Sequence, residues 1–140
     1  MIEFVSEHDA LLNECDWIAV DKNGLLGIFS TGGFGPLPKV LADKISVLDN
    51  IYEDVQAMPK ISESLQEKEV KQNIFSWICC SERGLYGYDW CNKNKAYKLL
   101  TSPSKPLLIE DINQTEQEKL AVFKLNVCFK ESKLIHFKES

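Results

Sequence analysis

The order of apolar and turn-forming segments predicts an α+β fold for this chain of 140 residues. Two strand-like segments come first, two helical segments follow, and strand-like segments then return. Blocks of this kind favour an antiparallel sheet over alternating βαβ units. We therefore expect an antiparallel sheet, built from hairpin and meander strands, packed against two longer helices and one short helix. The length and the hydrophobic content of 44% suit a single domain over residues 1–140.

The first two strands are predicted on either side of an Asn-Gly turn. Residues 16–20 and 25–29 are mostly apolar, and the polar segment between them ends in Asn23-Gly24. Asn-Gly supplies the positive φ angles of a tight hairpin turn, so we expect a β-hairpin. Upstream, residues 1–14 are expected to hold a short strand and a helical turn that Asp9 caps.

The helices are predicted by apolar residues that recur at steps of three and four. The first longer helix spans residues 37–58 and stops at Pro59. The second spans residues 64–80 and opens with Ser-Leu-Gln-Glu, a capping-box pattern. A short third helix over residues 115–123 opens with Thr-Glu-Gln-Glu, which is the same pattern.

A three-stranded meander is predicted between the second and third helices. Residues 84–89 and 96–100 are strand-like and are joined by a polar loop, and residues 107–109 follow a proline-containing turn. The end of the chain, up to about Phe137, is expected to be a mixed strand or an extended tail.

The composition favours a soluble, cytoplasmic protein. The first residues are acidic where a signal peptide is basic, and the apolar runs fall far below the roughly 20 residues that span a bilayer. Five cysteines, without a C-x-x-C pair, are typical of free thiols in a reducing compartment. A vicinal redox disulfide between Cys79 and Cys80 stays open as an alternative.

The sequence predicts no catalytic site, no metal site and no cofactor. His8 and His136 lie near opposite termini without a neighbouring nucleophile, and Cys and His never occur at paired zinc-ligand spacings. Residues 32–35 are glycine-rich and could bind phosphate through backbone amides, but the prolines that follow remove amide donors. We interpret this segment as a chain reversal. An enzymatic function that rests on the glycine loop and on Cys79-Cys80 is a third hypothesis.

The charge balance favours a basic protein partner. The net charge is −5 and Arg83 is the only arginine, which argues against a general nucleic-acid binder. Acidic residues concentrate in segments 49–54 and 110–118, either as solvated faces or as a surface that steers a basic partner. With the neighbouring aromatic residues, the candidate partner-binding set is Asp49, Tyr52, Glu53, Asp54, Tyr86, Tyr88, Trp90, Glu110 and Asp111.

One lysine-rich segment has two interpretations. Residues 93–105 carry four lysines beside Tyr86, Tyr88, Trp90 and Tyr97, a combination that can bind single-stranded nucleic acid by phosphate pairing and base stacking. Strand alternation instead places the first three aromatic residues on one side of a strand, where they pack on a helix or form a protein-interaction surface. We favour the second interpretation and expect no nucleic-acid partner.

A pattern of hydrophobic and turn positions over roughly residues 15–125 is similar to that of a known family. It comprises Asp16-Trp17-Ile18-Ala19-Val20-Asp21, Gly24, Gly27, Phe29, Gly32-Gly33, Arg83-Gly84-Leu85-Tyr86, Tyr88-Asp89, Tyr97 and Pro106-Leu107. In these positions the chain resembles small bacterial immunity proteins of polymorphic-toxin and contact-dependent growth inhibition systems. The resemblance implies that the protein binds the toxic C-terminal domain of a larger effector, frequently a nuclease, and blocks its active site or an essential surface.

The functional expectation is therefore a cytoplasmic immunity protein rather than an enzyme. It would bind and neutralise a cognate toxin domain, with a nuclease as the leading case, and it would engage neither nucleic acid nor membrane. The alternative is a general protein-interaction or regulatory module that is not linked to a toxin. The oligomeric state is left open by the sequence.

Overall fold

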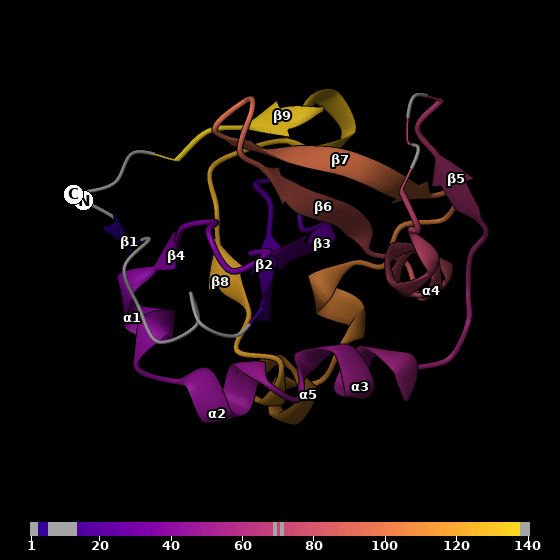
Figure 1. The fold of residues 1–140 in the computed structure, drawn as a ribbon. Helices are drawn as coiled ribbons and strands as arrows, with labels where there is room; N and C mark the ends of the chain where they lie inside the picture. Colours follow the sequence, from indigo (N-terminus) through magenta and orange to yellow (C-terminus); the bar gives the residue numbers. More distant parts are fainter. Residues whose placement is uncertain (1–2, 6–13, 69, 71, 138–140) are drawn as a thin grey trace.

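A computed structural model describes residues 3–5, 14–68, 70 and 72–137 of the chain. The fold class is α+β, as predicted (Figure 1). The strands are β1 (Phe4–Val5), β2 (Asp16–Val20), β3 (Leu26–Ser30), β4 (Leu37–Pro38), β5 (Ser64–Gln66), β6 (Tyr86–Cys91), β7 (Ala96–Pro103), β8 (Phe123–Lys124) and β9 (Leu134–Ile135). The helices are α1 (Lys39–Ala42), α2 (Ile45–Leu48), α3 (Ile51–Gln56), α4 (Phe75–Glu82) and α5 (Gln114–Lys119), with the 3-10 turns η2 (Ile109–Asp111) and η3 (Phe129–Glu131).

The central sheet is mixed rather than wholly antiparallel. Its strands follow the order β5-β7-β6-β3-β2-β8, and β9 also pairs with β7. The pairs β2–β3, β6–β7, β5–β7 and β7–β9 are antiparallel, as predicted, whereas β3–β6 and β2–β8 are parallel. Parallel neighbours need a long crossover connection, and the segment from α1 to α4 provides one between β3 and β6. The sequence pattern identified both hairpins but not the parallel contact that joins them.

The predicted first hairpin is present, with a longer turn than expected. Strands β2 and β3 pair antiparallel with Trp17 opposite Phe29. Gly24 has a φ of +83°, whereas Asn23 is not among the positive-φ residues, so this is not a two-residue Asn-Gly turn. The buried carboxylate of Asp21 shapes the loop instead, because it accepts hydrogen bonds from the backbone N–H groups of Asn23 and Leu25, both at 2.9 Å.

The predicted first long helix is divided into α1, α2 and α3. Residues 37–38 form β4, which pairs with β1, and turns at residues 43–44 and 49–50 separate the helical pieces. These turns contain Asp and Asn, whose short side chains favour turns over helix interiors. The predicted apolar stripe is confirmed in part: Leu41, Leu48, Ile51 and Val55 are buried, whereas Val40 is 62% exposed.

The capping-box pattern at residue 64 does not begin a helix. Residues 64–66 form β5, which pairs with the end of β7, and the helix begins later, at Phe75. The backbone N–H of Glu67 continues this pairing by donating to the Leu100 carbonyl at 3.0 Å. Hydrogen bonding to an open sheet edge thus outweighs the local helix signal.

Two further boundaries differ from the prediction. The third meander strand is reduced to an isolated bridge between Leu25 and Leu108, followed by η2. Helix α5 spans Gln114–Lys119 rather than residues 115–123. It begins earlier because the side chain of Asn113 accepts the Glu116 N–H at 2.8 Å and caps the helix, and it ends earlier because the chain turns into β8. The predicted N-terminal strand is represented by β1, whereas the turn capped by Asp9 lies outside the described residues.

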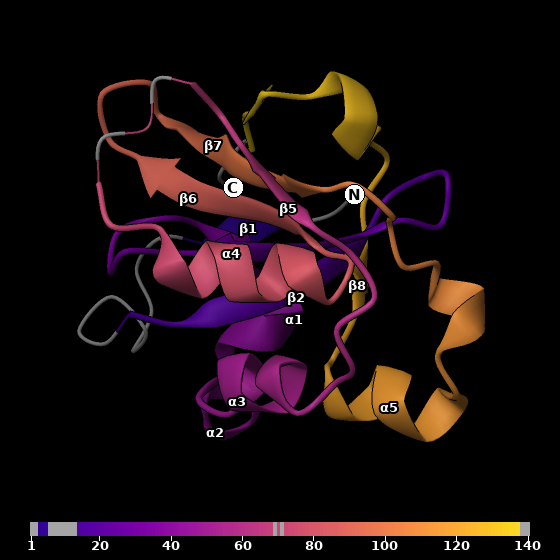
Figure 2. The ribbon, with the colours of Figure 1, turned by 90° about the vertical axis from the view of Figure 1, so that its right-hand side faces the viewer.

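The two faces of the sheet have different chemistry. On one face the ring of Phe29 stacks on Trp17 and on Tyr88, with centroid distances of 4.5 and 4.8 Å. Strand alternation points Ile28 and Gly87 to the opposite face, where a Cβ on Gly87 would lie 3.0 Å from Trp77 of α4. Figure 2 shows α4 lying across this second face, with α3 beneath it.

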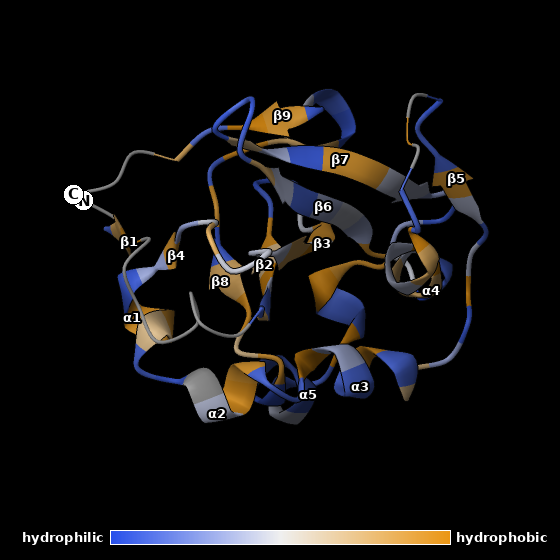
Figure 3. Ribbon diagram, in the orientation of Figure 1, coloured by the Kyte–Doolittle hydropathy of each residue, from blue (hydrophilic) through white to orange (hydrophobic). Residues whose placement is uncertain are grey.

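The buried side chains form one continuous cluster that both faces contribute to. Figure 3 shows the turn between β6 and β7 as hydrophilic and a band in the middle of β7 as hydrophobic. At the centre of the cluster, the Tyr97 hydroxyl accepts a hydrogen bond from Trp17 Nε1 at 3.2 Å and donates one to the Pro36 carbonyl at 2.7 Å. None of the helices in the described ranges has the length and apolarity that a membrane crossing requires.

Tyr97→Phe is expected to lower the free energy of unfolding by about 2 to 4 kcal/mol. The substitution leaves the buried Trp17 N–H and the Pro36 carbonyl without partners, and each orphaned group costs about 1–3 kcal/mol. Urea denaturation followed by circular dichroism measures the loss. As a control, Tyr52→Phe removes a half-buried hydroxyl that accepts from the exposed Gln56 amide, and it should cost less than about 1 kcal/mol. Equal losses in the two variants would contradict the role assigned to the Tyr97 hydroxyl.

Candidate partner-binding site

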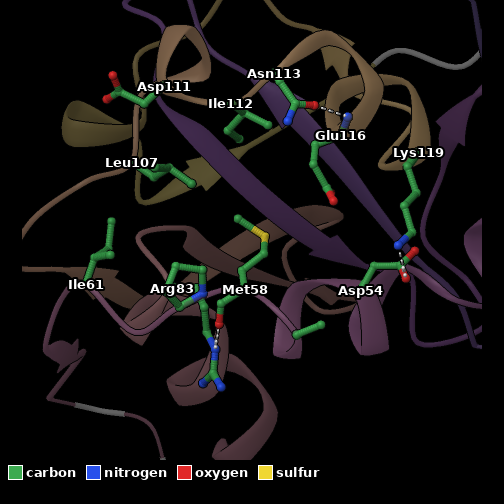
Figure 4. A pocket seen from close by; sticks show the side chains of 12 residues that line it. Asp54, Met58, Ile61, Arg83, Leu107, Asp111, Ile112, Asn113, Glu116 and Lys119 are labelled. Carbon is green, nitrogen blue, oxygen red and sulfur yellow. Dashed lines mark hydrogen bonds and ion pairs between the residues drawn. The ribbon is translucent and has the colours of Figure 1, made fainter.

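A cavity of about 300 Å³ opens between α3, the end of α4, η2 and α5 (Figure 4). We call it the α3–α5 groove. Its apolar floor and its charged rim come from segments that are far apart in the sequence. The lining residues are Asp54, Ala57, Met58, Pro59, Ile61, Arg83, Leu107, Asp111, Ile112, Asn113, Glu116 and Lys119.

The two basic residues of the groove are already engaged within the protein. The Arg83 guanidinium donates to the backbone carbonyls of Gln56, Met58 and Cys79 at 3.1, 3.3 and 3.1 Å. Lys119 forms an ion pair with Asp54, with Nζ and Oδ1 3.4 Å apart. Arg83 therefore fastens the end of α3 to α4 rather than presenting a free charge.

Two carboxylates of the groove have no basic partner in the described part of the chain. Neither Asp111 nor Glu116 takes part in an ion pair there. Figure 4 shows Glu116 pointing into the cavity and Asp111 pointing outward at its edge. The groove thus combines unpaired negative charge with an apolar floor.

Local hydrogen bonds explain how these carboxylates reach the groove. The Asn113 cap begins α5 and places Glu116 in its first turn. The Gln117 side-chain amide donates to the carbonyls of Ile109 and Ile112 at 3.2 and 2.8 Å, which ties η2 to α5. The position of Asp111 is therefore set by the same short helix as that of Glu116.

The predicted acidic residues are largely brought together on this side of the molecule. Asp54 and Asp111 line the groove, and their neighbours Glu53 and Glu110 are exposed on α3 and η2. Asp49 is exposed just before α3 and does not line the groove. The acidic segments 49–54 and 110–118 begin 61 positions apart in sequence, and the ion pair between Asp54 and Lys119 joins the two regions.

The predicted aromatic residues are divided between the core and a second cavity. Tyr86 and Tyr88 are 5% and 0% exposed, because the segment around Phe129 covers that face of the sheet. The Tyr88 hydroxyl donates to the Ser132 carbonyl at 2.7 Å. Burial therefore excludes these two side chains from a binding surface. It also removes them as stacking platforms beside the lysines of residues 93–105.

The second cavity has a volume of about 380 Å³ and is lined by Tyr52 and Trp90 of the predicted set. We call it the tryptophan pocket. Its other lining residues are Glu14, Asp16, Ile28, Ser30, Gly32, Ser76, Trp77, Cys80 and Asp89. Sequence reasoning missed Asp16 and Asp89, which lie 73 positions apart. The available signal was an aspartate within each of two otherwise apolar strands.

Burial perturbs both of these aspartates. Desolvation raises the pKa of Asp89 to about 6, although a hydrogen bond from Gln72 opposes the shift and the charge on Glu14 adds to it. Desolvation also raises the pKa of Asp16, against the hydrogen bond that it accepts from Ser30. In both cases the surrounding protein disfavours the charged carboxylate.

The glycine loop, the cysteines and the histidines, which are the other candidates for reactive chemistry, do not form a catalytic arrangement among the described residues. The backbone N–H groups of Phe34 and Gly35 donate to the Thr31 carbonyl, so the glycine loop closes a turn as interpreted. Each of the five cysteines is a free thiol, and burial raises the pKa of Cys80 well above its usual range. His136 is exposed, and His8 lies outside the described residues. Over the described ranges, no group of three His, Cys, Asp or Glu side chains is placed to hold a metal ion.

No protein-family model matches this chain. Comparisons with curated proteins and with solved structures likewise find no match.

Asp89→Asn is expected to raise the free energy of unfolding at neutral pH. The pKa of Asp89 is raised on folding from 3.8 to about 6, so its favourable contribution is complete below pH 3.8 and is lost as the pH rises through about 6. The variant should therefore show a flatter stability profile across that interval. Urea denaturation in a pH series measures this. The exposed Asp43→Asn serves as a control and should keep the wild-type profile.

Proposed function

We propose that this protein is a cytoplasmic immunity protein that neutralises a basic toxin domain, with a nuclease as the leading case, by binding it through the α3–α5 groove. The observation that supports the proposal is the pair of unpaired carboxylates, Asp111 and Glu116, beside an apolar floor. The resemblance of residues 15–125 to such immunity proteins points the same way.

The charge of the groove suits a nuclease as the partner. A nuclease binds phosphate through lysine and arginine side chains, so its active surface is basic. The exposed carboxylates of Glu53, Glu110 and Asp111 present the opposite charge on adjoining elements. Such complementarity accelerates association and favours the correct orientation. A protein seated over the basic surface would exclude the nucleic-acid substrate.

The apolar floor of the groove supplies the buried contact area that a lasting complex needs in addition to charge. Stable interfaces combine a desolvated apolar centre with a polar rim. Met58, Ile61, Leu107 and Ile112 form such a centre, with the carboxylates around them. A side chain from the toxin that enters the groove would displace water from these residues. The acidic rim would then govern the rate of association, and the floor would govern the lifetime of the complex.

Reversing the charge of the rim is expected to slow complex formation. The double variant Glu110→Lys/Asp111→Lys should lower the association rate constant for the cognate toxin domain by about tenfold or more at low salt. Surface plasmon resonance measures the rate, and survival of cells that co-express the toxin measures protection.

The matched control is Glu63→Lys/Glu131→Lys, which makes the same change in net charge at exposed positions outside the groove. This variant should associate at nearly the wild-type rate. The proposal is wrong if wild-type protein neither co-purifies with the toxin domain nor protects the cells. A stoichiometric non-toxin partner in a pull-down from the native host would instead identify a regulatory module.

A further inference from the structure

The tryptophan pocket is separate from the α3–α5 groove, although the same two helices help to form both. Tyr52 of α3 and Trp77 of α4 line the pocket, whereas Asp54 and Arg83, nearer the ends of these helices, line the groove. Strands β2, β3 and β6 close the pocket with Asp16, Ser30 and Asp89. No residue belongs to both linings.

The pocket holds negative charge that nothing in its lining compensates. Glu14, Asp16 and Asp89 contribute three carboxyl groups, and the lining contains no Lys, Arg or His. Desolvated carboxylates without a cationic partner are costly, because the protein interior solvates charge poorly. A cation placed among them would offset that cost.

Asp16 is the deepest of these groups and keeps an unused acceptor. Protein surrounds its carboxyl almost completely, yet the residue retains some exposed surface where it lines the pocket. Its Oδ1 accepts a hydrogen bond from Ser30 Oγ at 2.6 Å. Its Oδ2 accepts none from the residues that the structure describes. A carboxylate buried in this way presents an acceptor to whatever enters the pocket.

The aromatic wall of the pocket suits the same kind of ligand. The indole N–H of Trp77 donates to the Tyr88 carbonyl at 3.2 Å, and that of Trp90 donates to Asn92 Oδ1 at 2.9 Å. The Trp90 ring packs against Tyr97, its partner across β6 and β7, on the sheet face opposite α4. Trp77 is half-buried and, with its N–H group engaged elsewhere, offers ring surface rather than a donor to the pocket. Indole rings attract cations through their quadrupole, most strongly where water is excluded.

The dimensions favour an organic cation over a metal ion. A metal ion needs several ligands gathered around one point, and the carboxyl groups of the pocket do not form such a group among the described residues. A cavity of about 380 Å³ is far larger than a single ion requires. A planar guanidinium or an ammonium group on an alkyl chain could contact a carboxylate and an indole at the same time.

We propose that the tryptophan pocket binds the cationic end of an arginine or lysine side chain presented by a protein partner, with Asp16 and Asp89 as the acceptors and Trp77 as the aromatic wall. The identity of the partner rests on the proposed function, in which a basic toxin domain supplies the side chain. The pocket then anchors one residue of the toxin, and the α3–α5 groove receives another part of its surface.

Binding at the pocket depends on pH. Five titratable groups line the pocket. They are Glu14, which precedes β2, Asp16 of β2, Tyr52 of α3, Cys80 of α4 and Asp89 of β6. Because the pKa of Asp89 is raised to about 6 by burial, this carboxyl becomes protonated as the pH falls through that value. The affinity for a cation should therefore decline below about pH 6.

Ethylguanidinium is a suitable probe, because it carries the head group of arginine, and ethylurea is its neutral counterpart. The free protein, labelled with ¹⁵N, has three tryptophan indole signals, from Trp17, Trp77 and Trp90. Ethylguanidinium should shift the signal of Trp77 in a saturable manner and leave that of the buried Trp17 unchanged. Butylammonium tests the lysine head group in the same way. Equal shifts with ethylurea, or none with either cation, would overturn the proposal.

Isosteric variants locate the site. Asp16→Asn/Asp89→Asn keeps the shape of the pocket and removes its two buried charges, and it should weaken ethylguanidinium binding at least tenfold at neutral pH. Glu63→Gln/Glu131→Gln, which removes two charges at exposed positions outside both cavities, is the matched control and should bind as the wild type does. Folding of the double variant is verified by its indole spectrum. Unchanged affinity in a folded double variant would contradict the assignment of these carboxylates.

The outcomes for the pocket and for the proposed function can be separated. If ethylguanidinium binds at the pocket but the toxin domain does not bind the protein, the cation site stands and the proposed function fails. If the toxin binds and the Asp16→Asn/Asp89→Asn variant binds it equally well, the pocket has no part in that complex and this inference fails. A loss of toxin affinity of about tenfold in the double variant supports both.

Discussion

The stack of Trp17, Phe29 and Tyr88 is the contact on which the rest of the structure depends. The three rings come from β2, β3 and β6, so the stack crosses the junction between the two hairpins. That junction is a parallel pairing between segments that no short turn connects. Ring packing and the buried hydroxyl of Tyr97 therefore hold together two halves that backbone turns alone would leave independent. With the hairpins fixed, the opposite face of the sheet becomes a platform for α3 and α4.

The placement of these two helices determines both candidate sites. Arg83 fastens α3 to α4 through backbone carbonyls, and this connection leaves one cavity toward α5 and another toward the start of α4. Both cavities are acidic, but for different reasons. The groove gathers carboxylates from helices and turns, whereas the pocket contains two half-buried aspartates from strands of the sheet. The groove therefore suits long-range attraction of a basic protein, and the pocket suits close contact with a single cationic group.

The sequence was sufficient for local features and insufficient for long-range ones. The hairpin over residues 16–29 and the buried stripe of residues 41–55 followed from periodicity, because both patterns reflect neighbours in the chain. The strand at residues 64–66, by contrast, depends on its pairing with the distant strand β7. The acidic groove was partly foreseen, since Asp54 and Asp111 belong to charged segments. That Asp16 and Asp89 line the same cavity was not predicted, because it depends on the order of the strands in the sheet.

The outer side of β7 is shared by two partners, with β9 along its first half and β5 along its second. At the other end of the sheet, β8 is only two residues long. A foreign strand therefore finds little continuous backbone with which to extend the sheet, which protects the molecule from ribbon-like self-association at high concentration. Without a continuous free edge, a partner has to be recognised through side chains rather than through main-chain amides. Specificity for one ligand over its close relatives can then evolve by single substitutions, without any rearrangement of the strands.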